Sequence, residues 1–209
     1  MDRRAKFWNR IANRYARQPV ADEAAYQKKL QVTREYLRPD MEVLEFGCGT
    51  GSTAIVHAPY VKHIRAIDIS PKMIQIARDK AKAANIGNID FDCAAIDDFV
   101  QPDESLDVVM GHSILHLLED RDEAIAKIHR MLKPGGIFVS STACIGETMK
   151  LFKLVAPALK FLGVIPLVRF FTPKELEDSM ISAGFIIDHN WQTGKDKAVF
   201  MVALKAENA

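Results

Sequence analysis

The stretch VLEFGCGTGSTA (residues 43–54) places three glycines within five positions, at Gly47, Gly49 and Gly51. A short apolar run leads into the glycines, and a Ser-Thr pair follows them. Glycine adopts backbone angles that other residues avoid, and it has no Cβ atom to keep a ligand away from the backbone. The stretch therefore predicts one of two things: a cradle for a nucleotide-like cofactor, or a tight turn that only the fold needs.

On both sides of this stretch, predicted strands alternate with predicted helices. Short apolar segments predict strands at residues 42–46, 63–68, 89–92, 106–110 and 137–143. Helical patterns lie between them at residues 52–57, 71–84 and 122–132, and the last helix is expected to end at the Lys-Pro-Gly-Gly sequence 133–136. This alternation is typical of an α/β fold with a doubly wound, mostly parallel sheet.

The two ends of the chain depart from the alternation. Two helices are expected first, at residues 3–16, with Phe7, Ile11 and Tyr15 at helical spacing, and at 22–37. After residue 143 we expect an apolar helix at 147–162 and a second helix that Thr172 caps. Strands starting at 185 and covering 198–204 bring the number of strands to seven. No linker or repeat interrupts the pattern, so residues 1–209 are expected to form a single domain.

Composition narrows the class of protein. The chain has 209 residues and a formal net charge of +1, so nucleic acid is not an expected partner. The three cysteines lie far apart and predict reduced thiols, with neither a disulfide framework nor a metal site. No signal peptide and no apolar run long enough to span a membrane is evident. A cytoplasmic protein is the resulting expectation.

The spacing of the glycines indicates which cofactor suits the loop. The dinucleotide fingerprint is GxGxxG, whereas this loop reads GxGxG and has Ser52 at the position of the third glycine. The GK[ST] ending of a phosphate-binding loop is also absent. Glu45 comes just before the glycines, where its charge is unfavourable beside a pyrophosphate but favourable beside a cation. S-adenosylmethionine fits this pattern, because it carries a sulfonium and an ammonium group and no phosphate.

A second acidic residue supports an adenosine cofactor. Asp68 ends the second predicted strand, about 20 residues beyond the glycines, where an acidic side chain can accept from both ribose hydroxyls. A carboxylate suits two neighbouring hydroxyls because it offers two acceptor oxygens. Glu45 and Asp68 end adjacent predicted strands, and a cationic ligand rich in hydroxyls would compensate both charges.

Four segments together resemble the class I S-adenosylmethionine-dependent methyltransferases. They are EFGCGTG (45–51), DISPKM (68–73), LDVVMGHSILHLLED (106–120) and LKPGGIFV (132–139). The chain is similar in particular to the small-molecule group typified by ubiquinone and menaquinone biosynthesis methyltransferases. The resemblance implies a Rossmann-like sheet of seven strands with the last strand antiparallel, and a product, S-adenosylhomocysteine.

The resemblance also implies roles for individual residues. Glu45, Gly47 and Gly49 would face the methionine part of the cofactor, with Cys48 and Gly51 in the same loop. Asp68 would hold the ribose. The remaining cofactor contacts implied are Ile69 and Met73 around the adenine, Cys93 and Ala94 after the third strand, and Gly111 and His112 after the fourth. The family often has Asp at the position of Cys93, so this chain departs from the pattern there.

The expected function is methyl transfer to a small, apolar or aromatic acceptor. Tyr15 and His116 are the candidates for a catalytic role, since His can accept a proton at neutral pH. The alternatives are a non-catalytic S-adenosylmethionine-binding protein, a nicotinamide oxidoreductase, and a methyltransferase acting on a macromolecule. The sequence GHSILH (111–116) lacks the Asn-Pro-Pro-Tyr type of motif found in enzymes that methylate bases or glutamine amides.

Acceptor recognition is expected from two segments, the N-terminal helices (1–38), which form a lid, and a variable insertion (144–172). Within that insertion, residues 146–171 are very apolar and contain interspersed lysines. Three interpretations stay open for this segment: a helix packed on the sheet edge, a lid over a hydrophobic acceptor, or a helix that touches a lipid surface.

Overall fold

The computed structural model describes residues 3–144, 165–194 and 197–207. Two compact units make up the chain. The first contains Met1–Val100 and Leu106–Met110, and the second contains Gln101–Ser105 and Gly111–Ala209. Strand β4 (Leu106–His112) begins in the first unit and ends in the second.

The first unit is built on parallel strands. They are β1 (Glu42–Phe46), β2 (His63–Asp68) and β3 (Ile89–Cys93), and the first part of β4 pairs with β1. In the ladder between β1 and β2, Glu45 is opposite Ala66, and the two strands end side by side. Because both strands run in the same direction, Glu45 and Asp68 approach the same edge of the sheet, as the sequence predicted.

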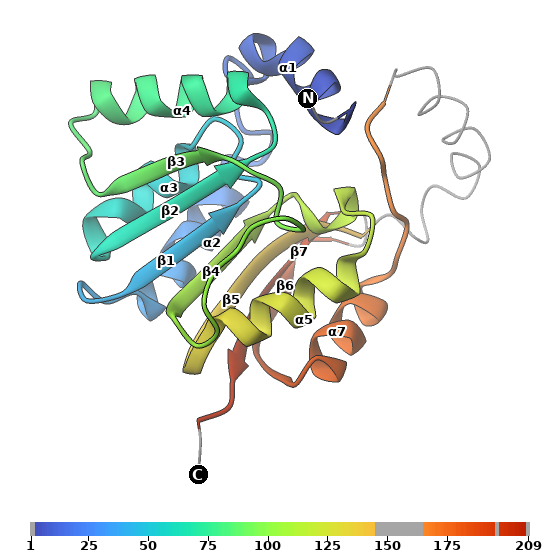
Figure 1. Ribbon diagram of the computed structural model, residues 1–209. Helices are drawn as coiled ribbons and strands as arrows, with labels where there is room; N and C mark the ends of the chain where they lie inside the picture. Colours follow the sequence, from blue (N-terminus) through green and yellow to red (C-terminus); the bar gives the residue numbers. More distant parts are fainter. Residues whose placement is uncertain (1–2, 145–164, 195–196, 208–209) are drawn as a thin grey trace. The chain divides into compact units, whose positions relative to one another are not determined.

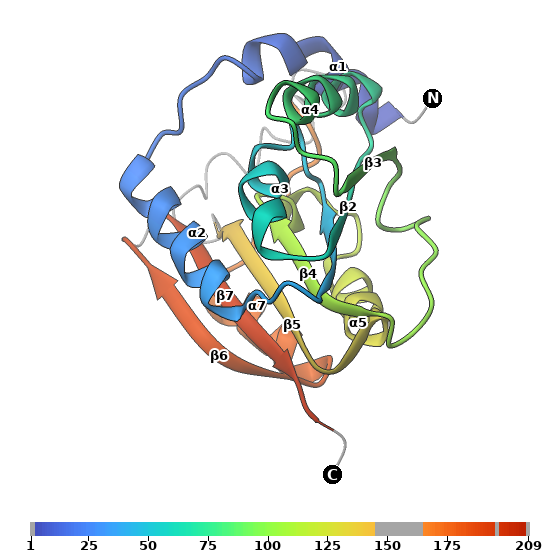
Figure 2. The ribbon, with the colours of Figure 1, turned by 90° about the vertical axis from the view of Figure 1, so that its left-hand side faces the viewer.

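Four α-helices belong to the first unit: α1 (Arg3–Tyr15), α2 (Glu23–Tyr36), α3 (Ser52–His57) and α4 (Pro71–Ala83). A short 3-10 helix, Ala58–Tyr60, follows α3. Side-chain caps fix two of the helix starts, since Asp22 accepts from the backbone of Ala25 and Ser70 accepts from that of Met73. Helix α4 lies along β2 and β3, and α1 packs against α4 (Figures 1 and 2).

The second unit contains an antiparallel ladder. Strand β7 (Ala198–Lys205) lies between β5 (Leu132–Ala143) and β6 (Phe185–Gln192) and runs antiparallel to both. Helices α5 (Arg121–Met131) and α7 (Pro173–Ser182) cover one face of these strands (Figure 1). A short 3-10 helix, Leu115–Leu117, follows β4. Thr172 caps α7 as predicted and forms a capping box with Glu175.

The seven strands are ordered β3-β2-β1-β4-β5-β7-β6. Strands β1 to β3 and the start of β4 are parallel, and β7 is antiparallel to its neighbours. This arrangement confirms the predicted α/β class with an antiparallel last strand. No helix in the described ranges is long and apolar enough to cross a membrane.

One predicted boundary is wrong, and one predicted element is outside the described residues. Residues 133–136 were expected to form a turn before the fifth strand, but β5 already begins at Leu132, in extended conformation. The ladder with β7 starts only at Ile137, and Gly135 before it has a φ of 73°. The helix predicted at 147–162 cannot be compared, because it lies outside the residues described.

Candidate functional site

The glycine loop joins β1 to α3 and bends back over the end of β2. Gly47, Gly49 and Gly51 all have positive φ, at 64°, 54° and 73°. The N–H of Cys48 donates to the carbonyl of Ile67 at 3.0 Å, which ties the loop to β2. Left-handed backbone at three alternate positions is strained for any residue except glycine, so the spacing of the glycines follows from the path of the loop.

Two of these glycines face different surroundings. A Cβ atom at Gly51 would lie 2.8 Å from the Cβ of Ala77 and 2.9 Å from the ring of Phe91, so this position is filled by packing. At Gly49 the nearest atom is Cε1 of Tyr15, at 3.8 Å from the position of such a Cβ. Gly51 therefore serves the fold, whereas Gly49 leaves the backbone open on the side of Tyr15. Gly51 thus fits the interpretation as a tight turn, and the interpretation as a cofactor cradle stays a prediction for Gly49.

Asp68 ends β2 and is hydrogen-bonded to the loop. Its Oδ2 accepts from the N–H of Gly49 at 3.0 Å, and its Oδ1 accepts from the N–H of Ser70 at 2.8 Å. Burial raises the pKa of Asp68, and these two hydrogen bonds oppose that rise. The carboxyl group is thus held in one orientation, and each of its oxygens keeps capacity for a second hydrogen bond.

Glu45 is the most buried acid of the site. Its side chain is 2% exposed, and Oε2 has no hydrogen-bond partner within the described residues. Burial raises the pKa of Glu45 to about 8, and the nearby charge of Asp68 adds to the rise. The group is consequently mostly protonated at neutral pH. In the described part of the chain, neither Glu45 nor Asp68 forms an ion pair with Lys, Arg or His.

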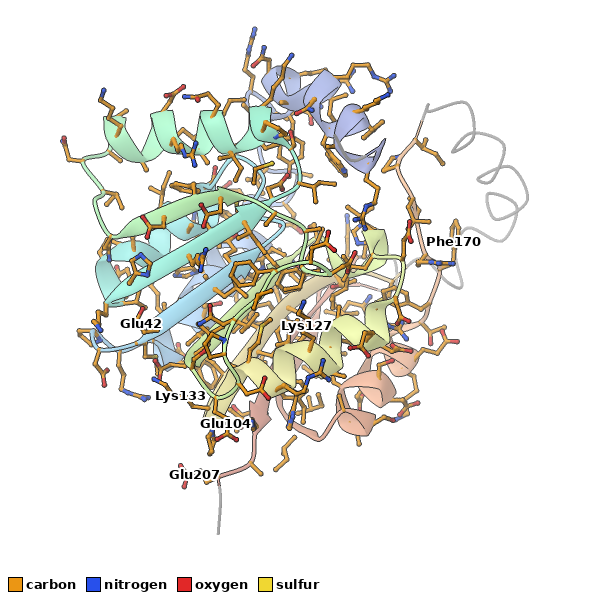
Figure 3. The ribbon with its side chains drawn as sticks, viewed as in Figure 1. Glu42, Glu104, Lys127, Lys133, Phe170 and Glu207 are labelled. Atoms are coloured by element: carbon orange, nitrogen blue, oxygen red, sulfur yellow. The ribbon has the colours of Figure 1, made fainter. Side chains whose placement is uncertain are left out.

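The opposite end of β1 shows how this chain treats an ordinary carboxylate. Glu42 lies at the start of the strand, three positions from Glu45 (Figure 3). Its carboxylate is 2.7 Å from Lys62 Nζ and 3.5 Å from His63 Nδ1. Acidic residues at the two ends of one strand therefore differ, since Glu42 is half-buried and paired with cations, whereas Glu45 is buried beside a second acid.

Two tyrosines from the N-terminal helices border the acids. Partial burial raises the pKa of Tyr15, and the charge of Asp68 raises it further. Burial also raises the pKa of Tyr26, which hydrogen-bonds to Thr53 and experiences the charge of Glu45. Tyr15 was predicted as a site residue, whereas the sequence left open whether Tyr26 covers the site or packs in the core, because α2 carries no motif that marks this position. The structure brings Glu45, Gly49, Asp68 and Tyr15 together.

Helix α1 is attached to this region by polar contacts. Asn9 Oδ1 accepts from the Ser70 hydroxyl at 2.7 Å and from the N–H of Lys72 at 3.2 Å. Arg4 forms an ion pair with Asp97 at 2.8 Å. Asn9 was also missed in the sequence, where a single Asn in an amphipathic helix gives no signal of its partners.

The other predicted contacts of the first unit vary in exposure. Cys48 is buried, and burial and the charges of Glu45 and Asp68 raise its pKa well above the usual value. Met73 is buried at 2% exposure, whereas Ile69 is half-buried. Cys93 is exposed, and its Sγ lies 3.5 Å from the carbonyl of Ile69. Ala94 follows, with its N–H donating to the carbonyl of Asp68 at 3.1 Å.

Three predicted residues, Gly111, His112 and His116, belong to the second unit. Gly111 and His112 end β4, and the next N–H, that of Ser113, donates to the carbonyl of Ser141 on β5. Burial lowers the pKa of His116 to about 4. Its Nδ1 has no hydrogen-bond partner within the described ranges, so the ring is a neutral imidazole at physiological pH.

The same unit holds buried hydroxyls on β5. The side chains of Ser140 and Thr142 are fully buried, and their hydroxyls have no hydrogen-bond partner among the residues described. No group of three or more His, Cys, Asp or Glu in the described part of the chain is arranged to hold a metal ion.

Comparison with known proteins agrees with this geometry. A sequence family described as "Methyltransferase domain" matches residues 43–136, which include the glycine loop and Asp68. The chain is also similar to the ubiquinone/menaquinone biosynthesis C-methyltransferase UbiE of Vibrio vulnificus, at 30% identity over 52% of this chain and 44% of that protein. These findings confirm the predicted resemblance to the class I S-adenosylmethionine-dependent methyltransferases.

Two further comparisons cover more of the chain. The ubiquinone biosynthesis O-methyltransferase of Sinorhizobium medicae is 26% identical over 95% of this chain and 84% of the relative. The crystal structure of the cyclase SpnF superposes with a TM-score of 0.73 at 20% identity, covering 87% of this chain and 81% of SpnF. For three curated relatives, the UbiE protein among them, the match spans only about half of the relative's length, between 44% and 55%. The likeness to SpnF shows the fold alone.

Proposed function

We propose that this methyltransferase-family chain transfers a methyl group from S-adenosylmethionine to a small acceptor that is apolar or aromatic. One observation carries the proposal: two acidic groups, the buried Glu45 and the half-buried Asp68, lie beside the open face of Gly49 without a cation from the described residues. A ligand that carries positive charge and ribose hydroxyls supplies what this arrangement lacks.

The chemical types of the residues around the loop match the groups of that ligand. Glu45, once ionised, would attract the ammonium and sulfonium groups, and Asp68 would accept from the ribose hydroxyls with its remaining lone pairs. The backbone of Gly47, Cys48 and Gly49 is the proposed surrounding of the methionine part, and Gly51 supports it through the packing of the loop. Gly111 and His112, in the second unit, stay contacts that only the sequence resemblance implies. The proposed contacts of the adenine are Ile69, Met73, Cys93 and Ala94.

The chemistry needs little help from the protein at the donor. S-adenosylmethionine, when bound, supplies a methyl group on a cationic sulfur that leaves as a neutral thioether. The chain therefore has to hold the acceptor atom in line with that methyl and exclude water. Positioning of this kind can lower the activation free energy by about 7–11 kcal/mol. Tyr15, beside the loop, is our candidate for orienting the donor or the acceptor.

A base is required only for an acceptor that must lose a proton. His116 is our candidate, because an imidazole that stays neutral can accept one. Its low pKa makes it a weak base, so it would take the proton of a phenol only as the bond to the methyl group forms, when the phenol oxygen becomes cationic and its proton acidic. The relatives named for quinone biosynthesis favour an acceptor of this aromatic kind. We place this activity in the cytoplasm and expect no nucleic-acid partner.

The competing function is binding of the same cofactor without methyl transfer. The fold is shared with SpnF, which is described as a cyclase, so the fold by itself does not determine the reaction. The acceptor panel in the experiment below distinguishes the two functions.

The test is calorimetric titration of S-adenosylmethionine, S-adenosylhomocysteine and NAD into the wild type, Asp68→Ala and Asp90→Ala. Asp90 lies on β3 and is 76% exposed, so its replacement is a matched charge control. We expect binding of both sulfur ligands but not of NAD, a loss of at least a hundredfold in Asp68→Ala, and wild-type affinity in Asp90→Ala. Failure of the wild type to bind either sulfur ligand would refute the proposal.

Turnover is then measured with methyl-labelled donor and a panel of phenols, quinols, amines and carboxylic acids. A labelled product from a phenol or quinol supports the proposed acceptor class. Tight cofactor binding with no labelled product from any acceptor would favour the non-catalytic function.

A further inference from the structure

The ammonium group of Lys80 lies beneath the glycine loop. Lys80 is on α4, and its Nζ donates to Oγ1 of Thr50 at 2.9 Å and to Oγ of Ser52 at 3.1 Å. Thr50 is a loop residue between Gly49 and Gly51 and is only 6% exposed, and Ser52 is the first residue of α3. Lys80 thus joins the loop and the start of the following helix to α4 from one point.

The face of α4 that carries Lys80 also carries the closest contact of the loop. Ala77, one turn before Lys80, limits the space at Gly51, where a Cβ would lie 2.8 Å away. Ala77 allows α4 to approach the loop, and Lys80 hydrogen-bonds to it. Gly49, the neighbour of Thr50 on the other side, donates its N–H to Asp68. Lys80 and Asp68 therefore fix the loop through adjacent residues.

A lysine is an unusual choice for this position. Its acceptors are two neutral hydroxyls, and within the described residues it has no carboxylate partner. Burial lowers the pKa of Lys80, which means that the site disfavours its charge. The ammonium also lies near the N-terminus of α3, where exposed N–H groups favour anions. An apolar or amide side chain would avoid these costs, so stability alone does not explain the residue.

We propose that Lys80 is a positioning residue for cofactor binding, which holds Thr50 and Ser52 so that the backbone at Gly49 stays in its binding geometry. The inference rests on the proposed function, since it concerns the same loop. Lys80 does not touch the ligand in this scheme. It acts through two hydroxyls that the ammonium, with three N–H donors, can reach together.

The experiment compares Lys80→Met, Lys80→Arg, Thr50→Val and Lys82→Met with the wild type by titration of S-adenosylmethionine and by thermal unfolding without ligand. Met has a similar length and no donor, whereas Arg restores several donors. Lys82 is exposed on the same helix and controls for the loss of one charge. We expect Kd to rise about tenfold in Lys80→Met, in keeping with loss of hydrogen bonds from a charged donor. Lys82→Met keeps the wild-type Kd, and Lys80→Arg recovers most of the affinity.

A double-mutant cycle separates positioning from simple destabilisation. If Lys80 acts through Thr50, the combined Lys80→Met/Thr50→Val variant binds only slightly more weakly than either single variant. For the acceptor identified in turnover, KM for S-adenosylmethionine rises in Lys80→Met and kcat changes less than threefold. Wild-type affinity in Lys80→Met, or full additivity in the cycle, would overturn the inference. Absence of binding in the wild type would instead refute the proposed function.

Discussion

The two units bury titratable groups of opposite kinds. In the first unit these groups lie at the carboxyl ends of β1 and β2, and in the second unit the group lies in the 3-10 helix after β4. The first region holds two acids, Glu45 and Asp68, and burial keeps Glu45 protonated at neutral pH. The second holds His116, whose ring burial keeps neutral. Glu45 and His116 are therefore both mostly uncharged at neutral pH, but Glu45 becomes charged when it loses its proton, whereas His116 becomes charged when it gains one.

This difference indicates that the two regions suit different kinds of ligand. A buried acid pair is completed by a cation, so the first region is suited to the charged donor. A neutral imidazole is suited to a ligand with polar groups and no net charge. The predictions below test this contrast, from the largest expected effect to the smallest.

The largest effect is expected from Gly51→Ala. The added Cβ meets Ala77 and Phe91, and φ is 73°, so the variant combines overlap with backbone strain. We expect a loss of about 2–4 kcal/mol in the free energy of unfolding and no measurable cofactor binding. Gly87→Ala, where nothing lies within 4 Å of the new Cβ, is the matched control. Denaturant unfolding and calorimetry measure both variants, and equal stability of the two would contradict the packing role of Gly51.

Glu45→Gln sharpens the contrast through proton exchange. The pKa of about 8 means that a cationic ligand must displace a proton near pH 7. Titrations in buffers of different ionisation enthalpy are expected to show release of about one proton in the wild type and none in Glu45→Gln, with binding weakened tenfold to a hundredfold. Between pH 6 and 7.5 the wild-type affinity rises with pH, and that of the variant stays flat. A wild type that binds without releasing a proton would break the comparison.

His116→Gln tests the second region with the opposite sign. The pKa of His116 is about 4 in the folded protein and near 6.5 in the unfolded chain, so its contribution to stability is present above pH 6.5 and declines as the pH falls. Gln does not titrate. Between pH 7.5 and pH 5, the variant is expected to lose about 1–2 kcal/mol less in unfolding free energy than the wild type.

Denaturant unfolding of His116→Gln at the two pH values makes this measurement. Glu45→Gln should show the reverse trend, because the raised pKa of Glu45 stabilises the folded state at low pH and is lost as the pH rises from about 4.5 to 8. Parallel pH profiles for the two variants would show that the regions do not differ as proposed.

Asn9→Ala is expected to have the smallest effect. It removes the acceptor of the Ser70 hydroxyl and the Lys72 N–H, which costs about 1 kcal/mol of stability. If α1 orders Tyr15 beside the loop, cofactor affinity falls threefold to tenfold in the same variant. Asn13→Ala, at an exposed position of the same helix, serves as the control. A Kd unchanged in Asn9→Ala would limit this contact to stability.

The sequence predicted those parts of the site that depend on local rules. Gly47, Gly49 and Gly51 need positive φ, and Asp68 follows a strand whose neighbour carries Glu45, so spacing and strand alternation sufficed. Parallel pairing then brought the two acids to one edge. The cap Thr172 was predicted for the same reason, since it bonds to a backbone N–H three residues away.

The sequence did not predict the contacts that join distant elements. Lys80 and Thr50 are 30 residues apart, and Asn9 and Ser70 are 61 apart, so no periodicity relates them. The role of Tyr26 stayed open in the sequence because its partners, Thr53 and Glu45, follow from the packing of α2. The start of β5 was placed too late because Pro134 and two glycines normally indicate a turn, whereas here they lie within the strand, with Gly135 at a φ of 73°.

The attachment of α1 has a practical consequence for recombinant work. The region recognised by sequence similarity starts at residue 43, so it leaves out the helix that carries Asn9 and Tyr15. A truncated version designed on those family boundaries would keep both acids and the glycine loop. It would lose the acceptor that Ser70 uses and the ring nearest to Gly49. Cofactor affinities measured on such a fragment would describe a site that lacks Tyr15. A low affinity of the fragment would therefore say little about the affinity of the full chain.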